Sequence, residues 1–216
     1  MIFFICGYRG SGKDTLCIET IKDGFISMLK KYNYRLYSSD NTNTNLQEME
    51  INTSSIKIIS LTTEVKEETI QEFGNIYPGL TEILSNPDLY QVNKNKSLFS
   101  LNGDSKTARE LMIEITMKRR LIDDNYWIKK TCEKLNPEEN YFIPEFRYKC
   151  SYDYLYKLFG DKVKTIRLVR IEVEIPSMEE TSEHELDNFT TDFLITDGFY
   201  YSTSLFLQYE NYVDIN

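Results

Sequence analysis

Three glycines, a serine, a lysine and an aspartate stand close together near the start of the chain, in the segment G-Y-R-G-S-G-K-D-T at residues 7–15. Glycine lets the backbone take positive φ, so that successive N–H groups can point at one anion. The preceding residues 1–6 form a continuous apolar run, which is typical of a strand buried on both faces of a parallel sheet. The residues after position 13 have a helical pattern, and a helix N-terminus also attracts anions. We therefore predict a phosphate-binding loop between a strand and a helix.

The lysine of this loop, Lys13, would place a positive charge between the β- and γ-phosphates of a nucleoside triphosphate. The loop fits the pattern G-x-x-x-x-G-K-[ST] except at its last position, where Asp14 replaces the hydroxyl that normally touches Mg²⁺. Asp14 or Thr15 must then take that task, directly or through water. The candidate ATP-binding residues in the loop are Gly7, Gly10, Ser11, Gly12, Lys13, Asp14 and Thr15. The alternative is a glycine-rich turn that binds nothing, and the agreement of strand, glycine spacing and lysine argues against it.

A second group of charged candidates follows the apolar run at residues 141–143, in the segment P-E-F-R. In an open parallel sheet, ligands bind beyond the carboxyl ends of the strands. Glu145 and Arg147 should therefore point into the same cleft as Lys13. The alternative is an ordinary pair of opposite charges on the surface.

Residues 107–121 are expected to form a helix that carries two further candidate arginines. Arg109, Thr116 and Arg120 lie at spacings of seven and four, on a face different from the apolar one. Arg109 and Arg120 are three turns apart, about 16 Å along a continuous helix, so they cannot both grip one phosphate. A solvated basic face is the alternative, and we favour it for Lys118 and Arg119. The predicted core stripe of this helix is Ala108, Leu111, Met112, Ile115 and Ile122.

The whole chain, residues 1–216, fits one α/β domain in which helices cover both faces of a parallel sheet. Further strands are expected at residues 56–61, 163–169 and 192–196, the second of which runs into Arg170. The first helix, residues 14–31, should turn a stripe of apolar residues to the core, namely Leu16, Cys17, Ile21, Phe25 and Leu29. A terminal helix is expected at residues 202–209.

Residues 62–64 resemble a helix start, which places Lys66 in the first turn of that helix. Between residues 66 and 106, Gly and Pro turn signals indicate short helices joined by turns. Such a segment fits a substrate-binding insertion between core strands, and it fits an ordinary helical crossover equally well.

Composition argues against several classes of protein. The formal net charge is −9 at pH 7, whereas a broad nucleic-acid or acidic-membrane surface needs a basic face. No apolar run approaches the roughly 20 residues of a membrane span, and the apolar start of the chain lacks the basic flank of a signal peptide. The four cysteines show no C-x-x-C spacing, which indicates reduced thiols in a cytosolic compartment.

Two polar segments are expected to carry no chemistry. The run N-T-N-T-N at residues 41–45 is typical of a mobile loop. The single histidine, His184, lies in the acidic stretch 172–187, with no accompanying triad or metal cluster, and it is expected to be solvated.

The loop resembles the phosphate loop of the deoxynucleoside monophosphate kinases of large DNA phages and viruses, in which aspartate commonly follows the lysine. The similarity continues along most of the chain, through T-A-R-E-L-M around Arg109, R-L-I-D-D-N-Y-W from Arg120, I-P-E-F-R ending at Arg147 and F-L-I-T-D-G at residues 193–198. Lys66 matches the lysine in the helix after the family's second strand. The chain departs from the family pattern at Glu145, where aspartate is usual, and it lacks an acidic residue around positions 149–151.

This resemblance implies a P-loop fold like that of nucleoside monophosphate kinases. It implies transfer of the γ-phosphoryl group of ATP, with Mg²⁺, to the 5′-phosphate of a deoxynucleoside monophosphate. The acceptor would be held by Arg109, Arg147 and Lys66. The partners would be nucleotides and the compartment the cytoplasm, that of the host if the protein is viral. Dimers are common in this family, so the resemblance allows a homodimer.

The remaining charged residues take roles from the same resemblance. Arg120 and Arg170 would lie nearer to the transferring group or to the ATP base as a lid closes. Glu145, together with Asp14 or Thr15, would orient Mg²⁺ and its waters, or the acceptor.

Three other functions are compatible with the same residues. Phosphomevalonate kinases share a similar G-K-D loop, so another small-molecule kinase of the same loop class is one of them. A non-catalytic nucleotide-binding protein with a decayed acceptor site is the second, and the departures around Glu145 make room for it. A simple nucleoside triphosphatase is the third.

Overall fold

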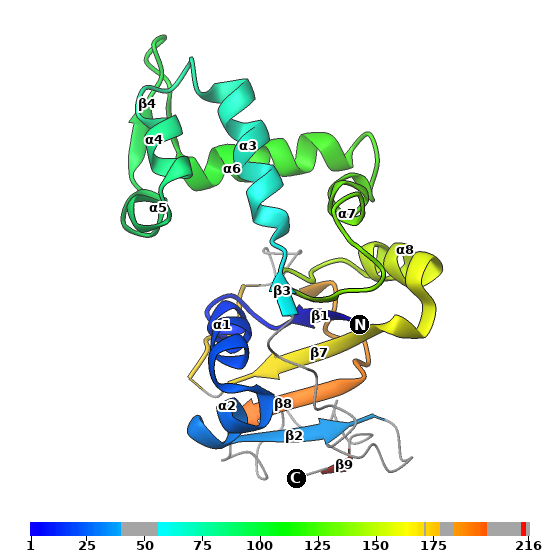
Figure 1. Cartoon of the computed structure of the whole chain (residues 1–216). Helices are drawn as coiled ribbons and strands as arrows, with labels where there is room; N and C mark the ends of the chain where they lie inside the picture. The colour runs from blue at the N-terminus through cyan, green and yellow to red at the C-terminus, as the bar shows by residue number, and fades with distance from the viewer. Residues whose placement is uncertain (40–55, 171, 178–183, 198–212, 215–216) are drawn as a thin grey trace. The chain divides into compact units, whose positions relative to one another are not determined.

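The protein is described by a computed structural model, which covers residues 1–39, 56–170, 172–177, 184–197 and 213–214 (Figure 1). The chain divides into two compact units, and each is considered by itself. Unit 1 comprises Met1–Ile59 and Leu135–Asn216, and unit 2 comprises Ser60–Lys134. Unit 2 therefore extends beyond the predicted insertion at residues 66–106, because it also contains the helix expected at 107–121.

Unit 1 is built on one sheet with the strand order β3-β6-β1-β7-β8-β2-β9. Its strands are β1 (Ile2–Cys6), β2 (Tyr34–Ser38), β3 (Ile56–Ile58), β6 (Asn140–Ile143), β7 (Val163–Val169), β8 (Phe193–Asp197) and β9 (Val213–Asp214). The strands from β3 to β8 are parallel, and β2 is antiparallel to both β8 and β9. The expected mixed α/β fold with a mainly parallel sheet is thus confirmed. The antiparallel edge formed by β2 was not predicted, and β3 ends at Ile58 instead of continuing to residue 61.

Strand β1 lies in the middle of the parallel strands, and all five of its residues are buried. It pairs with β6 on one side and β7 on the other, so that Ile2 is in register with both Tyr141 and Val163. Because parallel strands end at the same edge of a sheet, the segments that follow β1, β6 and β7 meet beyond their carboxyl ends. This arrangement positions the residues predicted to bind phosphate.

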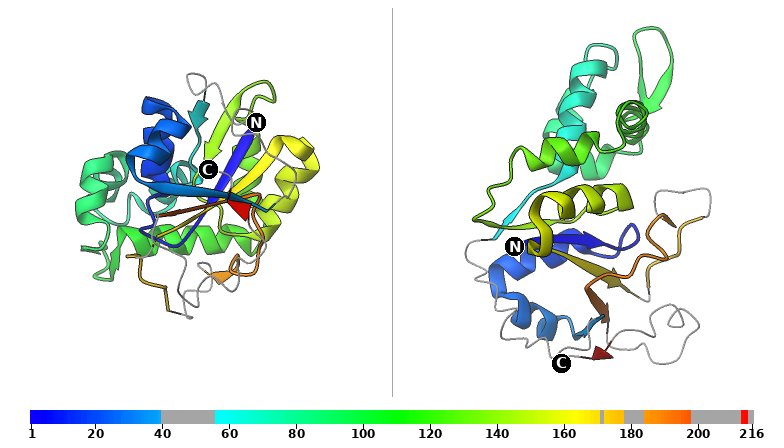
Figure 2. Two further views of the ribbon diagram at one scale, coloured as in Figure 1. Left: turned by 90° about the horizontal axis from the view of Figure 1, so that it is seen from below. Right: turned by 90° about the vertical axis from the view of Figure 1, so that its right-hand side faces the viewer.

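Helices cover both faces of this sheet (Figure 2). Helices α1 (Lys13–Asp23) and α2 (Phe25–Lys31) pack on the face that contains Phe3 and Ile5. Helix α8 (Lys149–Phe159) covers the opposite face, where its fully buried Leu155 lies. The single helix predicted over residues 14–31 is wrong, because Gly24 takes φ 83° and ends α1. The predicted stripe still faces the core, since both helices contribute to one apolar cluster.

Unit 2 is a small helical unit with one β-hairpin. Its elements are α3 (Leu61–Phe73), α4 (Leu80–Ser85), α5 (Pro87–Asn93), β4 (Ser97–Phe99), β5 (Ser105–Thr107), α6 (Ala108–Arg120) and α7 (Tyr126–Cys132). The prediction of short helices joined by turns is confirmed for α4 and α5. The hairpin was not predicted, although Gly103, which has φ 91° at its turn, is one of the glycine turn signals between residues 66 and 106. Lys66 lies in the second turn of α3, not in the first, because α3 begins at Leu61.

Helix α6 confirms the helix expected at 107–121. It begins with a capping box, in which the Thr107 hydroxyl accepts from the N–H of Glu110 and the Glu110 carboxylate accepts from the N–H of Thr107. The first four members of the predicted stripe, Ala108, Leu111, Met112 and Ile115, are buried. Ile122 is 77% exposed, because the helix ends at Arg120 and the stripe does not reach it.

A buried carboxylate ties three helices of unit 2 together. Glu68 on α3 accepts hydrogen bonds from Arg119 Nε at 2.6 Å, Lys130 Nζ at 2.5 Å and Tyr126 Oη at 2.6 Å. Burial acts to raise the pKa of Glu68, but these three hydrogen bonds outweigh it and hold the pKa below its ordinary value. The solvated basic face expected at Lys118 and Arg119 holds for the exposed Lys118, although it pairs with Glu72, but not for Arg119, which is partly buried and pairs with the buried Glu68.

Several further expectations can be compared with the structure. All four cysteines, each among the described residues, are free thiols. No helix in the described ranges has both the length and the apolar character needed to cross a membrane. The loop expected at residues 41–45 and the helix expected at 202–209 lie outside the described residues.

We expect Glu68→Gln to lower the free energy of unfolding by about 3 kcal/mol, at the lower end of the range for breaking a buried ion pair. The substitution keeps the size of the side chain but leaves Arg119 and Lys130, which retain some contact with water, without their shared carboxylate. Urea unfolding followed by fluorescence of Trp127, the single tryptophan, measures this, because Trp127 is buried in the core of unit 2. The exposed neighbour Glu67→Gln is the control and should stay within about 0.5 kcal/mol of wild type. A loss as small as that of the control would mean that the network adds nothing to stability.

Candidate phosphate-binding site

The loop between β1 and α1 has the backbone conformation that its glycines were expected to permit. Gly10 and Gly12 take φ of 85° and 92°, and Gly12 in its left-handed conformation is the N-cap of α1. Gly7 is required for a second reason, since a Cβ atom there would lie 2.4 Å from the carbonyl oxygen of Leu168 in β7. The loop therefore passes against the neighbouring strand more closely than any side chain would allow.

The lysine of the loop folds back over the turn. Lys13 Nζ donates to the carbonyl oxygens of Gly7 at 2.6 Å and Tyr8 at 2.9 Å, and lies 3.4 Å from Ser11 Oγ. These contacts hold the ammonium group at the mouth of the loop, close to the N-terminus of α1. Asp14 and Thr15 follow in the first turn of α1, where both are exposed. An ammonium group, a helix N-terminus and two exposed oxygen ligands are thus gathered within one turn.

Arg170, which follows the last residue of β7, lies beside this loop. A Cβ atom at Gly12 would be 3.6 Å from Arg170 Nη1, so the guanidinium and the start of α1 are neighbours. Arg170 is also 3.7 Å from the Glu172 carboxylate and 4.0 Å from that of Asp197. Its predicted position next to bound ATP is therefore compatible with the fold of unit 1.

Glu145 and Arg147 lie beyond the end of β6, on either side of Phe146. The Phe146 N–H donates to the Ile5 carbonyl at 3.1 Å, and its ring stacks on Phe4 with centroids 4.3 Å apart, which anchors this segment beside β1. Burial raises the pKa of the Cys17 thiol, and the negative charges of Asp14 and Glu145 raise it further. Both carboxylates are therefore within electrostatic reach of the second turn of α1.

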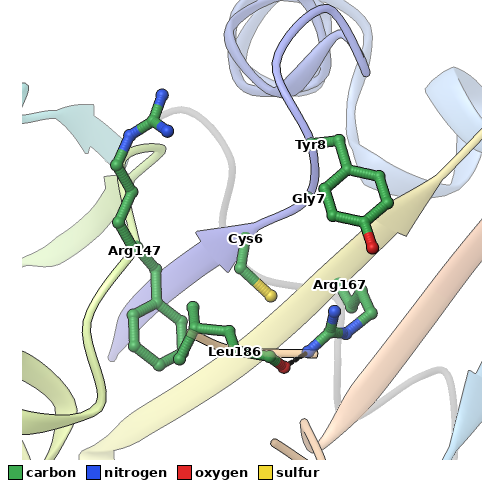
Figure 3. A pocket seen from close by; sticks show the side chains of 7 residues that line it. Cys6, Gly7, Tyr8, Arg147, Arg167 and Leu186 are labelled. Carbon is green, nitrogen blue, oxygen red and sulfur yellow. Dashed lines mark hydrogen bonds between the residues drawn. The ribbon is translucent and has the colours of Figure 1, made fainter. Parts of the chain in front are cut away.

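Arg147 lines a small pocket at the same edge of the sheet (Figure 3). The other lining residues come from the ends of β1, β6 and β7 and from the segment before β8, namely Cys6, Gly7, Tyr8, Phe146, Arg167 and Leu186. In Figure 3 the Arg147 guanidinium extends away from that of Arg167. Unit 1 thus brings Lys13, Glu145, Arg147 and Arg170 to the carboxyl ends of its parallel strands.

The segment that carries His184 packs against the loop, which the sequence did not indicate. Tyr8 Oη donates to Asp187 Oδ1 at 3.1 Å, and the other carboxylate oxygen, Oδ2, lies 2.8 Å from His184 Nδ1. His184 Nε2 lies 3.0 Å from the carbonyl oxygen of Pro176. The expectation of a solvated histidine is wrong, because only 10% of the His184 side chain is exposed. No local pattern could reveal this contact, since Tyr8 and Asp187 are 179 residues apart.

Arg167 also anchors the segment that carries His184. Its guanidinium is buried in β7 and donates to the carbonyl oxygens of Leu186 and, at 3.0 Å, Phe189. Arg167 was not among the predicted site residues, because an arginine within an apolar strand pattern gives no sign that it caps backbone carbonyls of a distant segment. Its charge is used for positioning the chain rather than for contacting solvent.

In unit 2 the structure brings two of the predicted substrate-binding residues together. Lys66 Nζ lies 4.3 Å from the centroid of the Tyr90 ring. Burial raises the pKa of Tyr90, and the positive charge of Arg109 acts against this, so Arg109 is within electrostatic range of this tyrosine. Arg120 is at the other end of α6, 3.7 Å from Asp124. The inference that Arg109 and Arg120 cannot share one phosphate is consistent with a continuous α6.

The described residues contain no group of three or more His, Cys, Asp or Glu side chains that could form a metal site by themselves. Mg²⁺ commonly needs fewer protein ligands, because it keeps several waters and binds one or two carboxylates together with substrate phosphates. Asp14 and Glu145, which both act on Cys17, fit that mode of binding, and Thr15 adds a hydroxyl next to Asp14.

No protein-family model matches this chain, and no curated protein matches it either. The class of protein is therefore defined by the fold and the site alone. The chain is a mixed α/β protein whose central sheet is mostly parallel and flanked by helices, an arrangement compatible with a P-loop-like fold.

The contacts of His184 predict a pH dependence of stability. Both ring nitrogens face acceptors, which only the imidazolium form satisfies, and the hydrogen bond to Asp187 raises the pKa of His184 above its ordinary value. The stabilisation is therefore complete below the pKa of the unfolded chain, about 6.5, and is lost as the pH rises through the higher pKa of the folded protein. We expect the difference in unfolding free energy between wild type and His184→Gln to be larger at about pH 6 than at about pH 9.

Urea unfolding followed by circular dichroism at the two pH values measures this difference. Asp187→Asn keeps His184 and removes the carboxylate that pairs with it. Its unfolding free energy should therefore differ from that of wild type by more at about pH 6 than at about pH 9, as for His184→Gln. A difference that stays the same at both pH values would contradict a charged His184 in the folded protein.

Proposed function

We propose that the protein is an ATP-dependent nucleotide kinase, which transfers the γ-phosphoryl group of ATP to the 5′-phosphate of a deoxynucleoside monophosphate and releases the diphosphate. One observation carries this proposal. A glycine loop with left-handed residues, its lysine, two arginines and a carboxylate gather at the carboxyl ends of neighbouring parallel strands. This combination suits phosphoryl transfer, in which the protein contributes mainly positioning and electrostatic stabilisation.

The triphosphate is held by the loop between β1 and α1. Backbone N–H groups of residues 10–15 point to the phosphate oxygens at the N-terminus of α1, and Lys13 moves its ammonium group from the Gly7 and Tyr8 carbonyls to the β- and γ-phosphates. Arg170, beside Gly12, contributes a second positive charge to ATP. Because Glu172 and Asp197 pair with Arg170, its guanidinium is held in place before ATP arrives.

The acceptor monophosphate is held by Arg147, Arg109 and Lys66, whose charges offset the repulsion between two anionic substrates. Arg120, three turns along α6 from Arg109, stabilises charge on the transferring group instead. Asp14, Thr15 and Glu145 would hold Mg²⁺ and its waters. The bound ion would neutralise charge on the phosphates of ATP.

Lys13→Ala tests the proposal directly. We expect the rate of diphosphate formation to fall by about 100-fold or more, because the lysine acts on charge that develops in the transition state. Lys22→Ala, on the exposed side of the same helix, is the matched control and should keep wild-type turnover. Circular dichroism should show that both variants remain folded.

The assay offers mevalonate phosphate and all common nucleoside and deoxynucleoside monophosphates separately, with ATP and Mg²⁺, and detects the diphosphate product. Near-normal turnover by the Lys13→Ala variant would remove the loop from the mechanism. Phosphate release without any acceptor would indicate a nucleoside triphosphatase. Turnover of mevalonate phosphate alone would indicate a different small-molecule kinase, and ATP binding without turnover a binding protein.

Arg109→Ala and Arg147→Ala should each weaken monophosphate binding by about 1.5 to 3 kcal/mol, the range for a hydrogen bond that involves a charged group. This corresponds to an increase in the acceptor KM of about 10- to 150-fold, while the KM for ATP stays near its wild-type value. Lys96→Ala, an exposed lysine in unit 2, is the control. An acceptor KM that either arginine variant leaves unchanged would exclude that arginine from the acceptor site.

A further inference from the structure

Tyr90, on α5, is surrounded by positive charge in unit 2. The ammonium group of Lys66, from α3, lies 4.3 Å from the centroid of its ring, and that of Lys94, at the end of α5, lies 5.8 Å from it. Arg109, in the first turn of α6, is near enough to act on the phenol oxygen. Its backbone N–H also donates to the Lys94 carbonyl at 3.1 Å, which ties the start of α6 to the end of α5.

Among the described residues, no carboxylate forms an ion pair with Lys66, Lys94 or Arg109. Lys94 Nζ instead donates to the side-chain oxygen of Gln91 at 2.8 Å. Such unpaired cations are unusual in a chain with 34 acidic and 25 basic residues. Elsewhere on α3, three glutamates each pair with a lysine or arginine. Burial lowers the pKa of Lys66, and among the described residues no carboxylate raises it again.

The Tyr90 ring explains how the positive charges of Lys66 and Lys94 are accommodated beside it. The face of a tyrosine ring carries negative electrostatic potential, and it attracts an ammonium group within about 6 Å of its centroid. The ring therefore holds Lys66 in place at a small energetic gain, which a dianionic ligand would exceed. The phenol hydroxyl of Tyr90, within electrostatic range of Arg109, is a neutral hydrogen-bond donor.

We infer that Tyr90 and Lys94 complete an anion site in unit 2 with Lys66 and Arg109, and that this site binds the phosphate group of the acceptor. Tyr90 acts as a positioning residue, because its ring orients the Lys66 ammonium group towards the ligand. Lys94 supplies a third positive charge. The choice of the acceptor's phosphate as ligand rests on the proposed kinase function, whereas the affinity of the site for a phosphate dianion does not.

The test follows Lys66 by NMR in the full-length protein, after reductive ¹³C-methylation of the lysines. The Lys66→Arg variant identifies the Lys66 resonance by its disappearance, and inorganic phosphate is the probe. We expect the resonance to be shifted by the ring current of Tyr90 and to titrate with added phosphate. Tyr90→Phe should keep the ring-current shift and most of the affinity, whereas Tyr90→Leu should lose the shift and bind phosphate about tenfold more weakly.

Lys94→Ala should weaken binding of phosphate at the same resonance by about three- to tenfold, and Lys96→Ala should leave it unchanged. Circular dichroism identifies any variant that does not fold. If Tyr90→Leu does not fold, Lys94→Ala, which changes a residue at a helix end, is the remaining test. A Lys66 resonance that does not respond to phosphate in the wild type would overturn the inference, as would unchanged binding by Tyr90→Leu and Lys94→Ala.

Kinetics separate this inference from the proposed function. If the site binds the acceptor, Tyr90→Leu raises the KM for the monophosphate with a smaller effect on kcat, and Tyr90→Phe restores it. Phosphate binding at Lys66 in a protein without kinase activity would reject the proposed function and keep the anion site. Kinase activity with no phosphate binding at Lys66 would reject the anion site and keep the proposed function.

Discussion

The contact between Gly7 and the carbonyl oxygen of Leu168 is the constraint on which the candidate site in unit 1 depends. It joins the end of β1 to β7 at a distance that excludes every side chain, so the loop must turn immediately and start α1 over the edge of the sheet. Arg170 then falls beside Gly12, because it lies two residues after Leu168, directly after the end of β7. On the other side of β1, the stacking of Phe146 on Phe4 brings Glu145 and Arg147 to the same edge. The positions of all these groups follow from the pairing of three strands.

The two units hold positive charge in physically different ways. In unit 1 the attraction for anions comes largely from backbone N–H groups and a helix N-terminus, which folding has already ordered. In unit 2 it comes from flexible side chains, two of which lie over the Tyr90 ring. Carboxylates elsewhere in unit 2 are used to hold helices together, as Glu68 does. The cations around Glu68 form ion pairs, whereas those around Tyr90 form none with the described residues, in keeping with the anion-binding role proposed for them.

Features encoded in short stretches could be predicted from the sequence. The loop, β6, β7, β8 and α6 were found because hydrophobic period, glycine spacing and capping residues act over a few positions. The end of α1 at Gly24 was missed because the apolar period continues through the glycine. Strand β2 was missed because its pairing with β8 decides its conformation. The contacts Tyr8–Asp187 and Lys66–Tyr90 were missed because each joins elements that only the fold brings together. Most of the loop site was therefore readable, and its supporting contacts were not.

The pairing of β2 with β8 has a consequence for how the chain acquires its structure during synthesis. Tyr34 is in register with Asp197, so β2 leaves the ribosome well over a hundred residues before its partner exists. At a synthesis rate of about 5–20 residues per second, its hydrogen-bonding edge stays open for roughly ten to thirty seconds. The core of unit 2 is complete within residues 60–134 and can form during that interval. The open edge of β2 must therefore be kept from aggregating, either by transient non-native cover or by a chaperone, until β8 has been synthesised.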